Sequence, residues 1–357
     1  MRHAQEADRE TGGSGLYNKL FVKMNRRIFL RQAAASLPAI AALGQTSISE
    51  PGARRIDFHH HFLPPAHIQA ILSQRESGQP PKWTPEISLE QMDKNGVATA
   101  ITSLVQPGVW IGDIQKSRAL ARACNEYGAK MAADYPGRFG FFAAIPLPDI
   151  EGSLREIAYA LDVLKADGIG LMTSFDGKYL GDPAFAPVLD ELNRRKAVVF
   201  THPTQPQCCM GLVPGVSVST IEYATDSTRT IASLLFSGTA ARCHDVRFIF
   251  SHGGGTVPFL VGRFETLANG KKAASLGEGV RPELRRFYYE IAQANHPGAL
   301  AALMKLVPIS QVLFGSDYPL RPIAEAVTGV RNYEFSDAER RMLERENART
   351  LLPGIKA

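Results

Sequence analysis

Eight short apolar segments, each followed by a helix-like segment, constrain the fold of this chain more than any other feature of its sequence. The alternation of strands with helices is typical of parallel α/β architecture. Eight such units over roughly 250–300 residues fit one (β/α)8 barrel of the TIM type. A doubly wound open sheet is the alternative, but no GxGxxG motif opens a first strand-to-helix turn. We therefore expect a single barrel domain over residues 51–357. The strands are expected at residues 55–60, 97–105, 140–145, 169–173, 197–201, 246–250, 287–291 and 311–314.

Helical periodicity and turn residues place the helices between these strands. A Pro- and Gly-rich loop at about residues 203–219 is long for an α/β connection, and such loops usually shape a site or act as lids. Specificity is expected in the loops at residues 78–88, 106–114 and 203–222. The helices are expected at residues 65–76, 89–95, 117–135, 154–166, 183–195, 227–241, 257–268, 297–306, 322–330 and 337–351.

The formal charge of +5 belongs mostly to the start of the chain. Residues 1–31 hold seven basic and three acidic side chains, so the remainder has 33 basic and 32 acidic ones and a net charge of +1. A nearly neutral body gives no reason to expect a nucleic-acid partner.

Residues 1–50 are predicted to be a leader, with an export signal at about residues 24–45. Arg26 and Arg27 precede Phe29-Leu30 and a short apolar run, an order that resembles a twin-arginine signal. We expect export, most simply to the periplasm, and a cytoplasmic protein if the leader is not functional. The alternative is an amphipathic helix of the mature fold. No apolar run reaches about 18 residues, so no membrane-spanning helix is expected.

Four histidines and one aspartate fall at the carboxyl ends of predicted strands. His59 and His61 end the first strand, His202 the fifth, His252 the sixth and Asp317 the eighth. In a barrel these ends meet on one face, so the five side chains are expected to share a site. Three imidazoles and a carboxylate can hold a divalent ion and leave a position open for water or substrate. One further imidazole then remains for proton transfer.

Each of these residues also has a structural interpretation. His202 before a proline could be a hydrogen-bonded strand end, the glycines after His252 could form a tight turn, and Asp317 could cap a helix. Their placement together favours function. On the first strand, His60 is expected to turn away from its neighbours, and Asp57 to contact the ligands rather than a metal.

Other catalytic motifs are absent from the sequence, which has no GxSxG, HExxH or GxxxxGK[ST] pattern. The four cysteines show no zinc-finger spacing. Cys124 and Cys243 are expected to be small buried apolar residues. Whether Cys208 and Cys209 stay reduced is left open.

Four motifs together resemble the amidohydrolase-related decarboxylases. They are Asp57-x-His59-x-His61, His202-Pro203, residues 250–255 (Phe-Ser-His-Gly-Gly-Gly) and residues 313–319 (Leu-Phe-Gly-Ser-Asp-Tyr-Pro). The relevant branch contains 2-amino-3-carboxymuconate-6-semialdehyde decarboxylase and 6-methylsalicylate decarboxylase, and the resemblance covers about residues 54–352.

This resemblance implies a distorted (β/α)8 barrel with one metal, zinc in several members and manganese in others. By the family pattern, His59, His61, His202 and Asp317 would be the ligands. His252 would be the catalytic histidine beside the metal. Because His252 and Asp317 can both approach the open metal position, we take both as candidates for proton transfer. The lysine that bridges two metals in hydrolytic relatives has no counterpart in the predicted strand at residues 169–173, which favours a single metal.

The sequence thus predicts a metal-dependent, non-oxidative decarboxylase of an aromatic or unsaturated carboxylic acid, salicylate-like or muconate-like, that releases carbon dioxide. One divalent metal is expected, zinc first and manganese second, and a homodimer would be ordinary for such an enzyme. The alternative is a metal-dependent hydrolase of a lactone, ester or amide. A non-catalytic barrel that binds a ligand or metal is the third hypothesis.

Overall fold

The computed structural model describes residues 54–74, 81–269 and 276–355. The predicted leader, residues 1–50, therefore lies outside the described residues. The described part belongs to one compact unit. No helix within the described ranges is long and apolar enough to span a bilayer.

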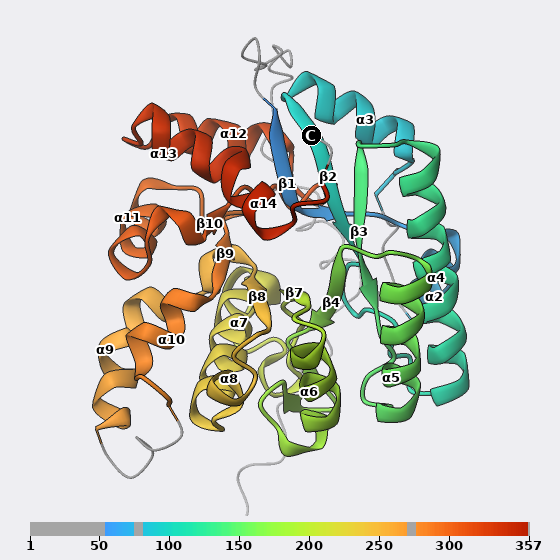
Figure 1. Ribbon diagram of the computed structural model, residues 1–357, viewed down its shortest axis with the longest axis horizontal. Helices are drawn as coiled ribbons and strands as arrows, with labels where there is room; N and C mark the ends of the chain where they lie inside the picture. The colour runs from blue at the N-terminus through green and yellow to red at the C-terminus, as the bar shows by residue number, and fades with distance from the viewer. Residues whose placement is uncertain (1–53, 75–80, 270–275, 356–357) are drawn as a thin grey trace, which may run out of the picture. The chain divides into compact units, whose positions relative to one another are not determined.

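Eight parallel strands form the sheet, in the order β1-β2-β3-β4-β7-β8-β9-β10 (Figure 1). Each strand overlaps one of the eight predicted segments, so the predicted barrel is confirmed. The strands are β1 Arg55–His61, β2 Val97–Ser103, β3 Phe139–Ala144, β4 Gly168–Met172, β7 Val198–His202, β8 Arg247–Phe250, β9 Tyr288–Glu290 and β10 Val312–Leu313.

The segment that follows β10 closes the barrel against β1. The amide of Phe58 donates to the carbonyl of Phe314 at 2.9 Å, and the amide of His61 donates to the carbonyl of Tyr318 at 2.6 Å. The amide of Asp317 also donates to the carbonyl of His59, at 2.7 Å. Backbone pairing thus joins β1 to the segment after β10, where the predicted site residues His59, His61 and Asp317 lie.

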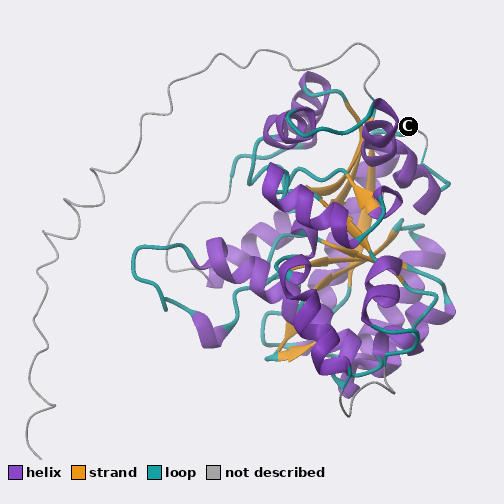
Figure 2. Cartoon of the chain, turned by 90° about the vertical axis from the view of Figure 1, so that its left-hand side faces the viewer, coloured by secondary structure: helices purple, strands orange, loops and turns teal. Residues whose placement is uncertain are grey.

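Helices surround the strands on the outside, purple around orange in Figure 2. Several begin with proline in the first turn, where its missing N–H costs no hydrogen bond. The helices are α2 Pro65–Gln74, α3 Pro85–Lys94, α4 Ile114–Asp134, α5 Ile150–Ala158, α6 Ala186–Arg194, α7 Val218–Phe236, α8 Thr239–Arg242, α9 Val257–Ala268, α10 Val280–Arg286, α11 Pro297–Leu306, α12 Ile323–Arg331, α13 Asp337–Arg341 and α14 Asn347–Leu351.

The main differences from the sequence-based expectation concern α7, a hairpin and α10. Helix α7 begins at Val218, whereas the periodicity indicated a start near residue 227. Its first turns line a pocket rather than the apolar core, so they lack an apolar stripe. A two-stranded hairpin, β5 Ser174–Phe175 with β6 Lys178–Tyr179, and the short helix α10 were not predicted. Elements this short carry too few residues to show a period.

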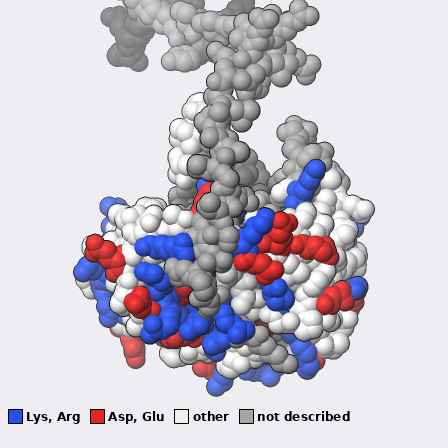
Figure 3. All heavy atoms as spheres, turned by 90° about the horizontal axis from the view of Figure 1, so that it is seen from above, with Lys and Arg blue, Asp and Glu red and all other residues white. Residues whose placement is uncertain are grey.

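The interior of the barrel is filled by an aromatic cluster. The rings of Phe142 and Phe200 stack with centroids 5.4 Å apart, and Phe58 lies 6.1 Å from Phe142. Leu351 of α14 belongs to the same buried cluster, so this helix packs against the barrel interior. On the outer surface that Figure 3 shows, basic and acidic side chains lie side by side.

Candidate active site

A β-bulge in β1 sets the direction of the first two histidines. Asp57 pairs with Ala100 and His60 pairs with Thr102, so β1 advances three residues while β2 advances two. The extra residue breaks the strict alternation of faces. Phe58 and His59, which would point to opposite faces of a regular strand, can therefore both face the barrel interior.

Despite the bulge, which includes His59, the rings of His59 and His61 point to one side, as the sequence predicts. Their Nε2 atoms lie 3.0 Å apart. The His60 ring turns away, also as predicted, and hydrogen bonds through its two nitrogens to Asp57 and Ser88. The Asp57 carboxylate also accepts from the backbone amide of His59 at 3.1 Å, so it braces the histidine pair.

The structure brings all five predicted site residues together at the carboxyl ends of the strands. Ligand atoms of His59, His61, His202 and Asp317 lie within 4.8 Å of one another. Asp317 Oδ1 lies 3.2 Å from His59 Nε2 and 3.1 Å from His61 Nε2. The His252 ring lies beside them, with its Nε2 atom 3.8 Å from Asp317 Oδ2. All five side chains are buried.

Hydrogen bonds on the far side orient three of the imidazoles. Each Nδ1 atom lies close to an oxygen that can only accept, which places the proton on Nδ1 and leaves the Nε2 lone pair facing the centre of the cluster. The acceptors are Glu290 Oε1 for His59 at 2.8 Å, the Ser103 carbonyl for His61 at 3.1 Å and the Pro203 carbonyl for His202 at 2.8 Å.

This arrangement fits a divalent cation. His202 Nε2 is buried and has no hydrogen-bond partner among the described residues. The Nε2 atoms of His59 and His61 lie 3.0 Å apart and both face Asp317 Oδ1, so the donor atoms converge on one point. A buried polar atom without a partner is costly, and a metal ion satisfies such atoms together. Three imidazole nitrogens and one carboxylate oxygen form a common donor set for zinc, with room for a further ligand.

The pKa shifts in the metal-free cluster follow from burial and from its two carboxylates. Burial disfavours a charged His59 ring, yet the charges of Glu290 and Asp317 raise its pKa to about 10. Burial lowers the pKa of His61 and lowers that of His202 well below its usual value. Burial opposes ionisation of Asp317, but the neighbouring His59 charge and the imidazole hydrogen bonds hold its pKa well below the usual range.

Backbone strain is concentrated at this face of the barrel. His252 and Asp317 have φ values of 54° and 64°, and Gln293 has a φ of 54°. Residues other than glycine rarely adopt this left-handed conformation, and such residues cluster at functional sites. Each of the three follows a different strand, so the strain belongs to the site and not to one loop.

Sequence reasoning missed two residues of this centre, both at the end of β9. Glu290 accepts from the backbone amide of His252 at 2.6 Å and from the ring of His59. Gln293 donates through Nε2 to Asp317 Oδ2 at 2.6 Å. A carboxylate inside an apolar strand was the available signal for Glu290, since such a group is rarely buried without a partner. No sequence signal marked Gln293.

A pocket of about 700 Å³ opens above the centre, with His202, His252 and Asp317 at its base. Its walls come partly from the loops expected to hold specificity, at residues 78–88, 106–114 and 203–222. Among its other lining residues are the amide side chains Gln106, Gln205 and Gln293, the aromatic Tyr223 and Phe259, and the apolar Leu63, Ile68, Ile71, Val105 and Leu320.

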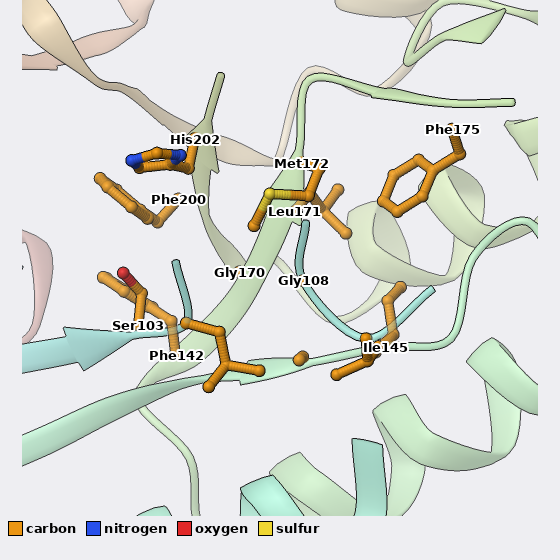
Figure 4. A pocket seen from close by; sticks show the side chains of 13 residues that line it. Ser103, Gly108, Phe142, Ile145, Gly170, Leu171, Met172, Phe175, Phe200 and His202 are labelled. Carbon is orange, nitrogen blue, oxygen red and sulfur yellow. The ribbon is translucent and has the colours of Figure 1, made fainter. Parts of the chain in front are cut away.

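A second cavity lies behind His202 and is too small for a substrate, at about 20 Å³. Figure 4 shows the His202 ring beside Phe200, with Met172 and Phe175 further along the cavity wall. The His202 ring is thus packed on its inner side by the barrel core. The larger pocket is therefore the route by which a substrate can reach the centre.

Cys208 and Cys209, whose state the sequence left open, form a disulfide in the loop after β7. Arg229 donates to the sulfur of Cys209 at 3.7 Å and pairs with Glu222 at 3.2 Å. Cys124 and Cys243 are free and buried, as expected.

A family model described as "Amidohydrolase" matches residues 56–354. "Decarboxylase yanB" of Aspergillus niger is 39% identical over 315 residues, which cover 83% of this chain and 85% of that protein. "6-methylsalicylic acid decarboxylase" of Penicillium expansum is 36% identical over 317 residues, which cover 85% of this chain and 97% of that protein.

Solved structures share the fold. The 5-carboxyvanillate decarboxylase of Novosphingobium aromaticivorans, crystallised with manganese and 4-hydroxy-3-methoxy-5-nitrobenzoic acid, superimposes with a TM-score of 0.78 at 20% identity, and the match covers 85% of this chain and 97% of that one. The fold is thus shared with a solved decarboxylase, and the cluster of ligand atoms in this chain supports a divalent metal site.

Proposed function

The chain belongs to the amidohydrolase family and is a decarboxylase, and we propose that its substrate is a hydroxybenzoate of the 6-methylsalicylate kind that carries a single carboxylate. The alternative from the sequence, a muconate-like acid, differs in having a second carboxylate. The charged groups that line the pocket distinguish between a substrate with one carboxylate and a substrate with two.

The charge of the pocket wall is the observation that carries the proposal. Among the described residues that line the pocket, Arg321 is the one guanidinium or ammonium group. Its Nε and Nη2 atoms donate to the two carboxylate oxygens of Glu325, both at 2.9 Å. This half-exposed pair partly neutralises the one cation of the wall, so a second substrate carboxylate would be poorly compensated for the hydration that it loses. An aromatic ring with neutral substituents suits the apolar and amide side chains instead.

We propose that the metal ligands are His59, His61, His202 and Asp317, and that the ion is zinc. Imidazole-rich, four-coordinate donor sets are typical of zinc, whereas manganese prefers more oxygen ligands. When bound, the ion acts as a Lewis acid for a substrate oxygen. The amides and apolar walls would then orient the ring so that its carboxylate faces the base of the pocket.

His252 is the proposed proton donor. Both nitrogens of its buried ring lack a hydrogen-bond partner among the described residues, so Nε2 can face a substrate. Transfer of its proton to the ring carbon that bears the carboxylate breaks the aromatic conjugation. Cleavage of the carbon–carboxylate bond then returns the electron pair to the ring and releases carbon dioxide. Asp317 Oδ2, 3.8 Å away, is placed to stabilise the charged imidazole.

Purified full-length protein with measured metal content tests this proposal. Carbon dioxide release is measured with salicylate and 6-methylsalicylate, with muconate and isophthalate as dicarboxylates, and with a panel of lactones. We expect about one zinc per chain and gas release from the monocarboxylates. Release from the dicarboxylates alone would refute the substrate class. Lactone cleavage without gas would instead support the hydrolase alternative.

We also propose that the protein is exported through a twin-arginine signal. The paired Arg26 and Arg27 before an apolar run support this, as does the disulfide of Cys208 and Cys209, because disulfides persist mainly in oxidising compartments. That export route carries folded proteins, which suits an enzyme that acquires its metal before it leaves the cytoplasm.

A further inference from the structure

The two oxygens of the Asp317 carboxylate have different surroundings. Oδ1 faces the Nε2 atoms of His59 and His61, at 3.2 and 3.1 Å. Oδ2 faces away from them and accepts the hydrogen bond from Gln293 Nε2 at 2.6 Å. The carboxylate is buried, so its rotation would have to break this contact.

The backbone after β9 is shaped to deliver the Gln293 amide to this position. The amide of Ala294 donates to the carbonyl of Ile291 at 2.9 Å, which closes a tight turn. Gln293 holds the left-handed conformation within that turn, with φ at 54°. A glycine would adopt this conformation more readily, so a glutamine here points to a role for its side chain.

The turn is also tied to the loop that carries His252. The Ala294 methyl group lies so close to Gly253 that a Cβ atom at this glycine would approach it to 3.0 Å. Glu290, at the start of the turn, accepts the His252 amide at 2.6 Å and the Ala292 amide at 2.7 Å. The position of Gln293 is thus fixed by the contacts of Glu290, which precedes it in the chain, and of Ala294, which follows it.

We infer that Gln293 is a positioning residue that holds Asp317 as a one-oxygen metal ligand. Its N–H group retains Oδ2 on the His252 side and keeps this oxygen from turning toward the bound ion. This inference rests on the proposed function only in taking Asp317 as a ligand. The Gln293 side chain also lines the pocket, so it connects the substrate wall to the metal centre.

Cobalt(II) substitution of the full chain gives a direct test, because the intensity of the cobalt visible bands falls as the coordination number of the ion rises. In Gln293→Met the side chain keeps its length but loses the N–H donor. We expect this variant to bind one cobalt per chain with weaker visible bands, because Oδ2 becomes free to join the coordination. We expect kcat to fall between about 10- and 100-fold, with a smaller change in KM.

Gln205→Met is the matched control, since Gln205 also lines the pocket but has no contact with Asp317. Its cobalt spectrum should equal that of the parent protein. Gln293→Leu, which also removes the donor, should change the spectrum as Gln293→Met does. It also serves if the methionine variant fails to fold.

Two results would overturn the inference. One is an unchanged cobalt spectrum in the folded Gln293 variants, even with reduced activity. The other is an equal spectral change in Gln205→Met. Neither result depends on the substrate. Failure of the inference about Gln293 is therefore distinguishable from failure of the proposed function, which would appear as a parent protein that releases no carbon dioxide from hydroxybenzoates.

Discussion

His59 and Glu290 form a buried pair in which the imidazole Nδ1 lies 2.8 Å from the carboxylate Oε1. Neither side chain is exposed to solvent. The same oxygen accepts the backbone amide of His252 at 2.6 Å. One carboxylate that contributes nothing to the proposed ligand set therefore orients both a proposed ligand and the proposed proton donor.

Glu290→Gln is expected to weaken metal binding by about 10- to 100-fold, because a neutral amide orients His59 less strongly and makes its ring a poorer donor. The affinity is measured by competition with a chelator over a pH series and is corrected for the proton that the metal displaces from His59, because Glu290→Gln should also lower the pKa of that ring. Glu156→Gln is the control, since Glu156 is a buried carboxylate that pairs with Arg122 at 2.8 Å outside the centre. A metal affinity for Glu290→Gln equal to that of the control would contradict the orienting role.

His202→Ala and His252→Ala should separate metal binding from turnover. We expect His202→Ala to lose metal and activity together, as should His59→Ala and Asp317→Ala. His252→Ala should retain most of the metal while kcat falls by about 10²- to 10⁴-fold, the usual contribution of a general acid. Elemental analysis and carbon dioxide release are measured on the same samples. Loss of metal in His252→Ala would make this residue a ligand instead.

Phe142→Ala is expected to lower the free energy of unfolding by about 3–5 kcal/mol, because it removes a buried ring from the stack in the barrel interior. Urea unfolding followed by circular dichroism measures the change. Phe259→Ala is the control for loss of a phenyl ring, since Phe259 is 76% exposed. Equal free energies for the two variants would show that the interior stack does not stabilise the barrel.

The strands and the convergent histidines could be predicted because both depend on local features. A continuous apolar run such as residues 140–145 predicts a buried strand, and the barrel rule then brings strand ends together. The bulge in β1 could not be predicted, because the extra residue is visible only against the register of β2. The prediction for His59 and His61 held because both rings still face one point despite the bulge.

The residues that support the site were harder to find. Gln293 acts through a turn conformation and a contact with Asp317, and neither leaves a pattern in the sequence. The first turns of α7 face the pocket, so their polar and small side chains concealed a helix. Contacts between residues that are distant in the sequence, rather than local helix or turn propensity, determine these two features.

Export is tested with the double variant Arg26→Lys, Arg27→Lys. We expect the parent protein in the periplasmic fraction and the variant in the cytoplasm, because the receptor for this signal reads the arginine pair as an address. The control is Arg2→Lys, Arg9→Lys, which changes two arginines upstream of the signal and should leave export intact. A parent protein confined to the cytoplasm would contradict the proposed location.

Metal affinity should rise with pH, and the pKa shifts give the sign. In the metal-free protein the pKa of His59 is about 10, because Glu290 and Asp317 favour its charged form despite burial. At pH 8 a divalent ion must therefore displace one proton from this ring. His61 and His202 are already neutral there and Asp317 is already ionised, since the pKa of each is lowered. The apparent affinity should thus increase about tenfold per pH unit below pH 10.

Proton release on zinc binding, followed with an indicator dye in weak buffer, measures this coupling. We expect about one proton per zinc at pH 8 from the folded parent protein, after correction for zinc hydrolysis. In Glu290→Gln the pKa of His59 should fall, because one of the two carboxylates that raise it is gone. Fewer protons should then be released at the same pH. Equal release from both proteins would mean that the Glu290 charge does not hold the proton on His59.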